Sequence, residues 1–293
     1  MRAALIRAFF DEATNSVSYL IADEATKSAA IIDPVLDFDP VTGAVATRSA
    51  DQLLQVAADH DLTIGWLLET HAHADHLSAA YYLKRRTGAK SAVGAGIREV
   101  QKVFGPKFAM DDLRANGGDF DLLLLDGSSI PLGKLTIEVM ATPGHTPACV
   151  SYHVGDAVFV GDTMFMPDYG TARCDFPGGD ARQLYRSMHR ILSLPRDTRL
   201  FMCHDYKAPG RDRFAWETNV GQQLDANIHI AGGVTEDDYV VMRETRDASL
   251  KAPKLLYSAI QVNIRGGRLP PRHSNGTSYL RLPLEVPEAL AGD

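Results

Sequence analysis

The 293-residue chain has few cysteines, no long apolar run and no excess of basic residues. Its three cysteines, Cys149, Cys174 and Cys203, are widely spaced and form no Cys-x-x-Cys pair, which favours a reducing, cytoplasmic location over a disulfide framework. No stretch approaches the roughly 18 apolar residues of a membrane-spanning helix. The formal charge of −7 argues against a nucleic-acid or anionic-membrane partner. Asp11 and Glu12 interrupt the N-terminal segment, so no secretory signal is expected.

Apolar runs separated by turn residues predict strands and helices that alternate along the chain. Strands are expected at residues 17–22, 29–33, 63–69, 122–125, 129–132, 135–141, 150–154, 156–160 and 199–203. Helices are expected at 50–60, 79–88, 97–104, 180–192 and 217–227, with a loop at 36–48 and an apolar run at 255–262. We expect residues 1–210 to form a catalytic domain. Residues 211–293 are expected to be an α-rich extension packed on it, not an independent domain.

The most informative stretch is Thr70–His76, which holds three histidines and one aspartate. His71, His73, Asp75 and His76 directly follow the predicted strand 63–69, where side chains leave the sheet edge. A polar loop, or a helix start capped by Asp75, would leave the alternation of histidines unexplained. Because imidazole and carboxylate groups are common metal ligands, this spacing predicts a metal site.

Three further candidate ligands stand after later predicted strands. His145 lies in Pro-Gly-His-Thr, Asp162 in Val-Gly-Asp-Thr and His204 in Cys-His-Asp-Tyr. Their shared position after a strand allows them to reach a common cleft. Together with the earlier four they form a nitrogen and oxygen donor set, which suits zinc, iron or manganese rather than a thiolate site. A carboxylate can bridge two metals, and Asp162 is the natural candidate.

These four motifs, spread over residues 15–210, resemble those of the metallo-β-lactamase superfamily. The resemblance implies an α+β fold, a four-layer αβ/βα sandwich with the metals at one edge of two sheets. It also implies that Asp33 orients a ligand histidine. The segments 161–176, 216–220 and 260–265 are similar to the glyoxalase II and persulfide dioxygenase group, whose members act on glutathione derivatives.

The resemblance leaves two reactions open. We expect the catalytic residues to be His71, His145, Asp162 and Asp75. As a persulfide dioxygenase, the interpretation we favour, the protein would hold one Fe²⁺ through His71, His145 and Asp162. It would oxidise glutathione persulfide with O₂ to sulfite and glutathione, and iron is needed because zinc has no redox chemistry. As a glyoxalase II-like hydrolase of glutathione thioesters, it would hold two Zn²⁺ ions or a mixture of zinc, iron and manganese. The resemblance then assigns His71, His73 and His145 to one metal, Asp75, His76 and His204 to the other, and Asp162 to both.

Substrate contacts are implied for two residues. In the resemblance Arg173 shapes the pocket, and Tyr206 contacts the glutathione backbone. A third interpretation is a non-catalytic metal-binding scaffold or sensor, which the loss of a ligand would support; none of the motif positions is lost. The sequence leaves open whether residues 211–293 cover the cleft or form a homodimer interface.

Overall fold

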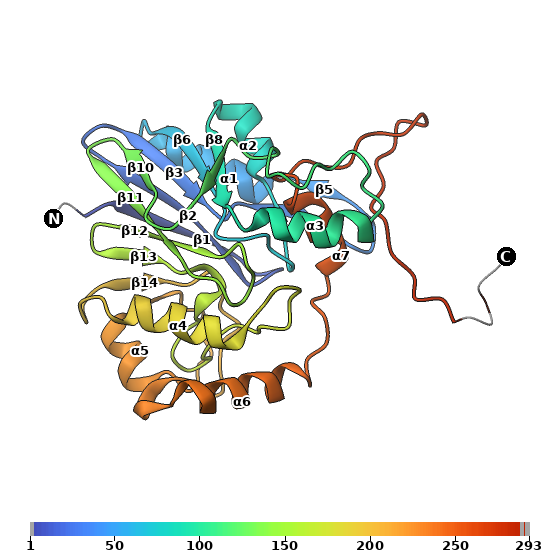
Figure 1. The fold of residues 1–293 in the computed structure, drawn as a ribbon. Coiled ribbons are helices and arrows are strands. Elements are labelled where there is room, and N and C mark those ends of the chain that lie inside the picture. Colours follow the sequence, from blue (N-terminus) through green and yellow to red (C-terminus); the bar gives the residue numbers. More distant parts are fainter. Residues whose placement is uncertain (1–2, 288–289, 291–293) are drawn as a thin grey trace.

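The computed structural model describes residues 3–287 and residue 290, and two mixed sheets form its centre (Figure 1). The first sheet contains, in spatial order, β1 (Leu5–Asp11), β2 (Ser16–Asp23), β3 (Ser28–Ile32), β6 (Thr63–Leu68), β8 (Lys90–Gly94) and β9 (Leu122–Leu124). The second contains β10 (Ser129–Leu132), β11 (Leu135–Ala141), β12 (Val150–Val154), β13 (Ala157–Phe159), β14 (Arg199–Phe201) and β15 (Glu217–Asn219). A small third sheet joins β5 (Val45–Ala46), β4 (Val35–Phe38) and β7 (Leu77–Ser78).

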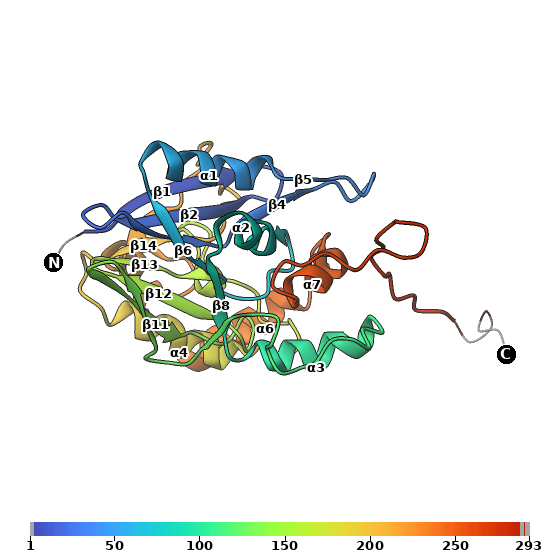
Figure 2. The same ribbon diagram turned by 90° about the horizontal axis from the view of Figure 1, so that it is seen from above.

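Helices cover the outer face of each large sheet (Figures 1 and 2). The first sheet carries α1 (Arg48–Asp59) and α2 (Ala80–Thr87), with α3 (Ile97–Lys107) and α7 (Leu256–Asn263) at its edge. The second carries α4 (Ala181–Leu192), α5 (Val220–Ala226) and α6 (Glu236–Asp247), and short 3₁₀ turns occur at Gly161–Thr163 and Ala231–Gly233. The predicted α+β fold, with helix, sheet, sheet and helix layers, is confirmed. In the described part of the chain, every helix is too short or too polar to cross a bilayer.

Side chains of β2 show why the two sheets pack together. Val17, Tyr19 and Ile21 lie in the core between the sheets, whereas Leu20 and Ala22 pack toward the helices of the outer layer. Because both faces of β2 are buried, apolar residues follow one another from Tyr19 to Ala22 without alternating with polar ones.

Several elements differ from the sequence-based expectation. The loop expected at 36–48 contains β4 and β5, which pair with each other through Asp37↔Ala46 and Phe38↔Val45. The helix expected at 217–227 begins only at Val220, because residues 217–219 pair with β14 as an edge strand. Strands β1, β7 and β8 and helix α6 were not predicted, and the apolar run at 255–262 forms α7. The short strands in this group depend on partners distant in sequence, so local patterns did not indicate them.

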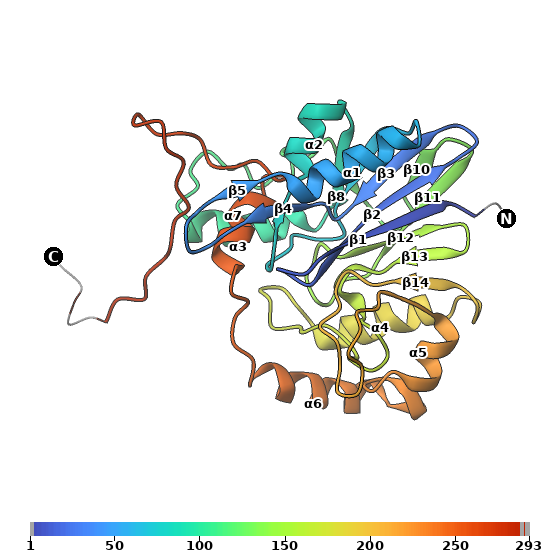
Figure 3. The same cartoon turned by 180° about the vertical axis from the view of Figure 1, so that it is seen from behind.

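The candidate ligand loops leave one edge of the two sheets (Figure 3). Parallel pairing of β3 with β6 brings Asp33 beside Thr70, and parallel pairing of β13 with β14 brings Asp162 near His204. Parallel neighbours end at the same edge, so segments far apart in sequence meet there. Gly161 packs against Thr70 at φ +53°, and a Cβ atom on it would lie 2.7 Å from the Thr70 side chain.

Candidate metal centre

The seven predicted ligand residues lie together at this edge. Six of them are buried, namely His71, His73, His76, His145, Asp162 and His204, and Asp75 has a side chain that is 24% exposed. The ligand atoms of His71, His145 and Asp162 all lie within 4.8 Å of one another, and those of His73, Asp75 and His76 form a second such group. The sequence-predicted set is therefore a spatial cluster.

Asp33 and Thr70 fix two of the imidazoles. His73 Nε2 donates to Asp33 Oδ1 at 3.0 Å, and Asp33 also accepts from Thr70 N at 2.7 Å and Thr70 Oγ1 at 2.8 Å. The Thr70 hydroxyl in turn lies 3.0 Å from His71 Nδ1. Asp33 holds this position with φ +50°, a conformation that costs an L-residue roughly 1–2 kcal/mol. Carboxylates that hold the second nitrogen of a histidine fix its tautomer and the direction of its free nitrogen.

The other three imidazoles are held in the same way. His145 Nδ1 donates to Arg173 O at 2.7 Å, and His204 Nδ1 donates to Asn15 O at 3.2 Å. His76 Nδ1 lies 3.2 Å from Ser16 Oγ. Each histidine therefore uses one nitrogen for anchoring and presents the other to the cluster.

The presented atoms match the requirements of a cation. Four ring nitrogens and one carboxylate oxygen are buried with no hydrogen-bond partner among the described residues: His71 Nε2, His73 Nδ1, His76 Nε2, His204 Nε2 and Asp162 Oδ1. An unsatisfied buried polar atom costs about 1–3 kcal/mol, so a cluster of them is stable only with a common partner. Imidazole and carboxylate donors fit a divalent transition metal.

Distances across the cluster place Asp162 between two groups of ligands. Its Oδ2 lies 3.6 Å from His145 Nε2 and 3.9 Å from His71 Nε2, whereas its Oδ1 lies 3.3 Å from His204 Nε2. His204 Nε2 is also 3.2 Å from Asp75 Oδ2. Two atoms that ligate one tetrahedral ion at about 2.1 Å lie about 3.4 Å apart. The Asp162–His145–His71 atoms and the Asp162–His204–Asp75 atoms therefore both have spacings near those of metal ligands.

Protonation differs between the two groups. Burial, followed by the nearby His73 and His145, lowers the pKa of His71 well below its usual value, which favours the neutral form that binds metals. Burial opposes a charge on His204, but Asp75 and Asp162 raise its pKa well above the usual value. Likewise, against the effect of burial, His204 lowers the pKa of Asp75. Asp75 and Asp162 therefore surround the His204 ring with negative charge.

The cluster opens onto a cavity of about 290 Å³, which Asp75, His145 and Asp162 help to line. Tyr206 also lines it, and its ring stacks on the His204 imidazole with centroids 5.6 Å apart and planes at 17°. Phe165 packs against the edge of Tyr206 at 6.0 Å. Tyr206 therefore lies between His204 and the cavity.

Arg173 lines the same cavity, but its guanidinium is already engaged. It donates to both carboxylate oxygens of Asp175 at 2.5 Å and to Lys251 O at 2.7 Å. Its own carbonyl accepts the proton of His145 Nδ1. Arg173 therefore forms the wall of the cavity and anchors a ligand histidine.

Two arginines of α6 were missed by sequence reasoning. Arg243 is 1% exposed, pairs with Asp247 at 2.6 Å and donates to Thr171 O at 3.1 Å. Arg246 also lines the cavity, and within residues 3–287 no carboxylate lies at ion-pair distance from it. The Arg243 to Asp247 spacing was a usable helix signal. No sequence signal placed that helix beside the metal loops.

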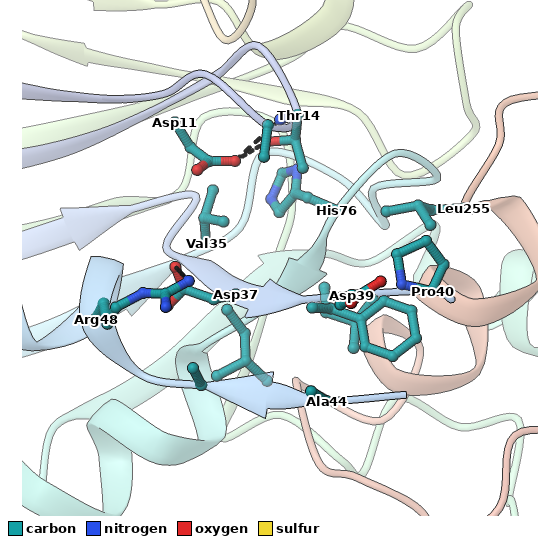
Figure 4. A pocket seen from close by; sticks show the side chains of 15 residues that line it. Asp11, Thr14, Val35, Asp37, Asp39, Pro40, Ala44, Arg48, His76 and Leu255 are labelled. Carbon is teal, nitrogen blue, oxygen red and sulfur yellow. Dashed lines mark hydrogen bonds and ion pairs between the residues drawn. The ribbon is translucent and has the colours of Figure 1, made fainter. Parts of the chain in front are cut away.

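A second cavity, of about 520 Å³, is bordered by His76 (Figure 4). Acidic side chains Asp11, Asp37 and Asp39 and the cation of Arg48 line it. Among the seven ligand residues only His76 borders this cavity, and its Nε2 is fully covered. The 290 Å³ cavity, which Asp75, His145 and Asp162 line, therefore gives access to the candidate ligand cluster.

Comparisons with known sequences agree with this geometry. The Metallo-beta-lactamase superfamily matches residues 12–204. A Burkholderia pseudomallei protein named "Probable metallo-hydrolase" is 52% identical over 297 residues, covering 96% of this chain and 99% of its own. "Glyoxylase B2" of Dictyostelium discoideum is 48% identical, covering 90% of this chain and 91% of its own. Human "Persulfide dioxygenase ETHE1, mitochondrial" is 32% identical, covering 69% and 68%.

A solved structure extends the comparison to the fold. The crystal structure of ETHE1 from Myxococcus xanthus superposes with a TM-score of 0.71 at 33% identity, covering 90% of this chain and all of the other. The family match spans every loop that carries a candidate ligand. On these grounds the chain belongs to the metallo-beta-lactamase superfamily.

Proposed function

We propose that the protein is an iron-dependent persulfide dioxygenase that oxidises glutathione persulfide with O₂ to sulfite and glutathione. The observation that carries the proposal is the group formed by His71, His145 and Asp162, two imidazoles and one carboxylate beside the open cavity. This donor set is typical of iron(II) oxygenases and leaves positions for a substrate and O₂. Similarity to persulfide dioxygenases at 32–33% identity supports it.

The chain's own residues orient this group and control access to it. When bound, one Fe²⁺ per chain would supply the redox chemistry that activates O₂. Asp33, through Thr70, holds His71, and the Arg173 carbonyl holds His145. Asp75 and Asp162 both reach the cavity and His204. Because Asp162 is a ligand of the iron in this proposal, we assign Asp75 as the proton acceptor for the substrate persulfide.

The cavity also has features that suit a peptide thiol. Phe165, Tyr169 and Tyr206 give it an aromatic wall, and Arg246 contributes a cation at its edge. We assign Arg246 to a carboxylate of glutathione and Tyr206 to the peptide backbone. In this assignment Arg173 is a pocket-shaping residue, because Asp175 and Lys251 occupy its donors.

A binuclear thioester hydrolase is the second candidate, and the position of Asp162 favours it. Its two carboxylate oxygens face different ligand groups, as a bridging carboxylate would. The 48% identity to Glyoxylase B2 supports the same candidate. His73, Asp75, His76 and His204 are then ligands instead of hydrogen-bonding neighbours. A non-catalytic scaffold or sensor would be supported by the loss of a ligand position, and all seven positions carry a ligand residue.

Metal analysis and two activity assays test the proposal. The protein is purified without added metal, and O₂ uptake with glutathione persulfide is compared with hydrolysis of lactoyl-glutathione. We expect one iron per chain and O₂ uptake. Two zinc ions per chain, with thioester hydrolysis and no O₂ uptake, would support the hydrolase instead.

A further inference from the structure

Helix α7 comes from the far end of the chain, yet it is buried beside the metal-binding loop. Ala259, Ile260 and Val262 are fully buried, and Figure 2 shows α7 next to α2 and α3. Its C-terminal end is also fixed, because Gln101 Nε2 donates to Ile264 O at 2.8 Å and Arg265 pairs with Asp112. These contacts support the proposal that the segment from residue 211 through α7 is an extension of the preceding domain and not an independent domain.

Asn263, the last residue of α7, binds the backbone of the metal loop. Its Nδ2 donates to His73 O and to His76 O, each at 2.8 Å, and its Oδ1 accepts from Ser78 N at 2.8 Å. The residue is 4% exposed. One amide therefore holds the carbonyls of two ligand histidines and the amide at the end of their loop.

The ends of the same loop are tied at Ser78. Its hydroxyl donates to the buried carboxylate of Glu69, which precedes the loop. The Glu69 carbonyl accepts in turn from Tyr152 Oη at 2.7 Å. Gly267 follows α7 with φ +82°, and a Cβ atom there would lie 2.8 Å from Ser78 O. The loop, its two ends and the end of α7 therefore form one close-packed unit.

We propose that Asn263 is a positioning residue of the metal centre and that docking of α7 is coupled to metal binding. The backbone positions of His73 and His76 determine where their imidazoles point. Loss of the Asn263 side-chain amide leaves the carbonyls of these two residues buried and unpaired, and it widens the range of loop conformations. The coupling is reciprocal: the docked helix raises metal affinity, and the bound metal stabilises the docked helix. In two-metal chemistry His73 and His76 would themselves be ligands. In one-metal chemistry the same loop carries the ligand His71, and the coupling would act through the loop backbone.

A pair of matched variants tests the proposal. Asn263→Ala removes the contacts to the metal loop. Gln261→Ala removes a similarly buried amide of α7 whose partners are Tyr257 O and the backbone of Arg281, away from the loop. Each protein is loaded with Zn²⁺, and the rate of zinc transfer to a chromophoric chelator is measured. We expect about 10–100-fold faster release from Asn263→Ala and the wild-type rate from Gln261→Ala.

Equal release rates for the two variants, or a wild-type rate for Asn263→Ala, would overturn the proposal. Thermal unfolding of the metal-free proteins shows whether each variant folds. If Asn263→Ala does not fold, Asn263→Asp takes its place. The aspartate keeps the acceptor for Ser78 N, but a carboxylate oxygen replaces the Nδ2 donor and faces the carbonyl oxygens of His73 and His76. Fast zinc release from Asn263→Asp supports the proposal, and the wild-type rate refutes it.

The reciprocal effect has its own readout. Hydrogen exchange of the α7 amides is measured with and without Zn²⁺ in the wild type and in Asn263→Ala. We expect zinc to slow exchange in the wild type much more than in the variant. An equal effect of zinc on exchange in the two proteins would contradict the coupling between α7 docking and metal binding. Neither measurement uses O₂ or a persulfide, so its result is independent of the proposed dioxygenase activity.

Discussion

The two parts of the metal centre differ in their access to solvent. His71, His145 and Asp162 stand beside the open cavity, with spacings of 3.6 and 3.9 Å from the aspartate to the imidazoles. In the other part, His204 approaches Asp75 to 3.2 Å and has the Tyr206 ring stacked on it. Similar ligand types thus give one accessible group and one covered group, in which His204 is fully buried and Asp75 reaches the cavity. We propose that substrate chemistry takes place at the accessible group and that the covered group decides how many metals are held.

The largest expected effect comes from the accessible group. His71→Ala should abolish metal binding, because His71 is a ligand under both candidate functions. His153→Ala is the control, since His153 contacts Gly155 O and Glu138 far from the cluster. Elemental analysis after purification measures the metal. Wild-type metal content in the His71→Ala protein would show that His71 is not a metal ligand.

His204→Ala separates the two parts of the centre. Under the dioxygenase proposal we expect the variant to keep one iron per chain, because His204 is not among its three ligands. Metal content and O₂ uptake are measured on the same preparation. Loss of half the metal of a two-metal wild type would instead make the covered group a second metal site.

Arg246→Ala tests the substrate side of the accessible group. Losing one charge-assisted hydrogen bond should raise KM for glutathione persulfide roughly tenfold while kcat changes little. Arg182→Ala is a control, because Arg182 pairs with Glu236 and Asp237. Steady-state O₂ uptake gives both constants. A large fall in kcat with constant KM would contradict a role in binding.

The smallest effect concerns His229, behind the cavity wall. Burial, then Arg243 and Arg246, lowers its pKa to about 4, and its Nδ1 accepts from Thr171 N at 3.0 Å. The unfolded state therefore binds more protons between pH 6.5 and 4, so stability falls as pH falls through this range. His229→Asn, which keeps an acceptor, should reduce the loss by about 1–2 kcal/mol. Urea unfolding of the metal-free proteins at several pH values checks this, and parallel pH profiles would contradict it.

The sequence was sufficient to predict the candidate ligand motifs and the strands that precede them. The motifs at Thr70–His76, His145, Asp162 and His204 are local, and each follows an apolar run, so their convergence at a sheet edge was predictable. The resemblance also implied that Asp33 orients one of the histidines, and the structure shows that this histidine is His73.

The contributions of the C-terminal segment were not predictable from the sequence. Asn263 lies 190 residues from His73, and no local sequence pattern indicates the partners of its side-chain amide. Arg265 is 6% exposed and pairs with Asp112, a contact that no local pattern indicated. The engagement of Arg173 by Lys251 O depends on the chain after α6. Such contacts depend on tertiary packing and have no local sequence signature.

Oxygen stoichiometry with a defined metal tests the central claim most directly. Metal-free protein is reconstituted with Fe²⁺ or with Zn²⁺, and O₂ uptake and sulfite formation are followed after addition of glutathione persulfide. The reaction of one persulfide with one O₂ and one water gives one thiol, one sulfite and two protons. We predict equal amounts of O₂ consumed and sulfite formed with Fe²⁺, and none with Zn²⁺. Iron-loaded protein that consumes no O₂ but hydrolyses lactoyl-glutathione would contradict the claim.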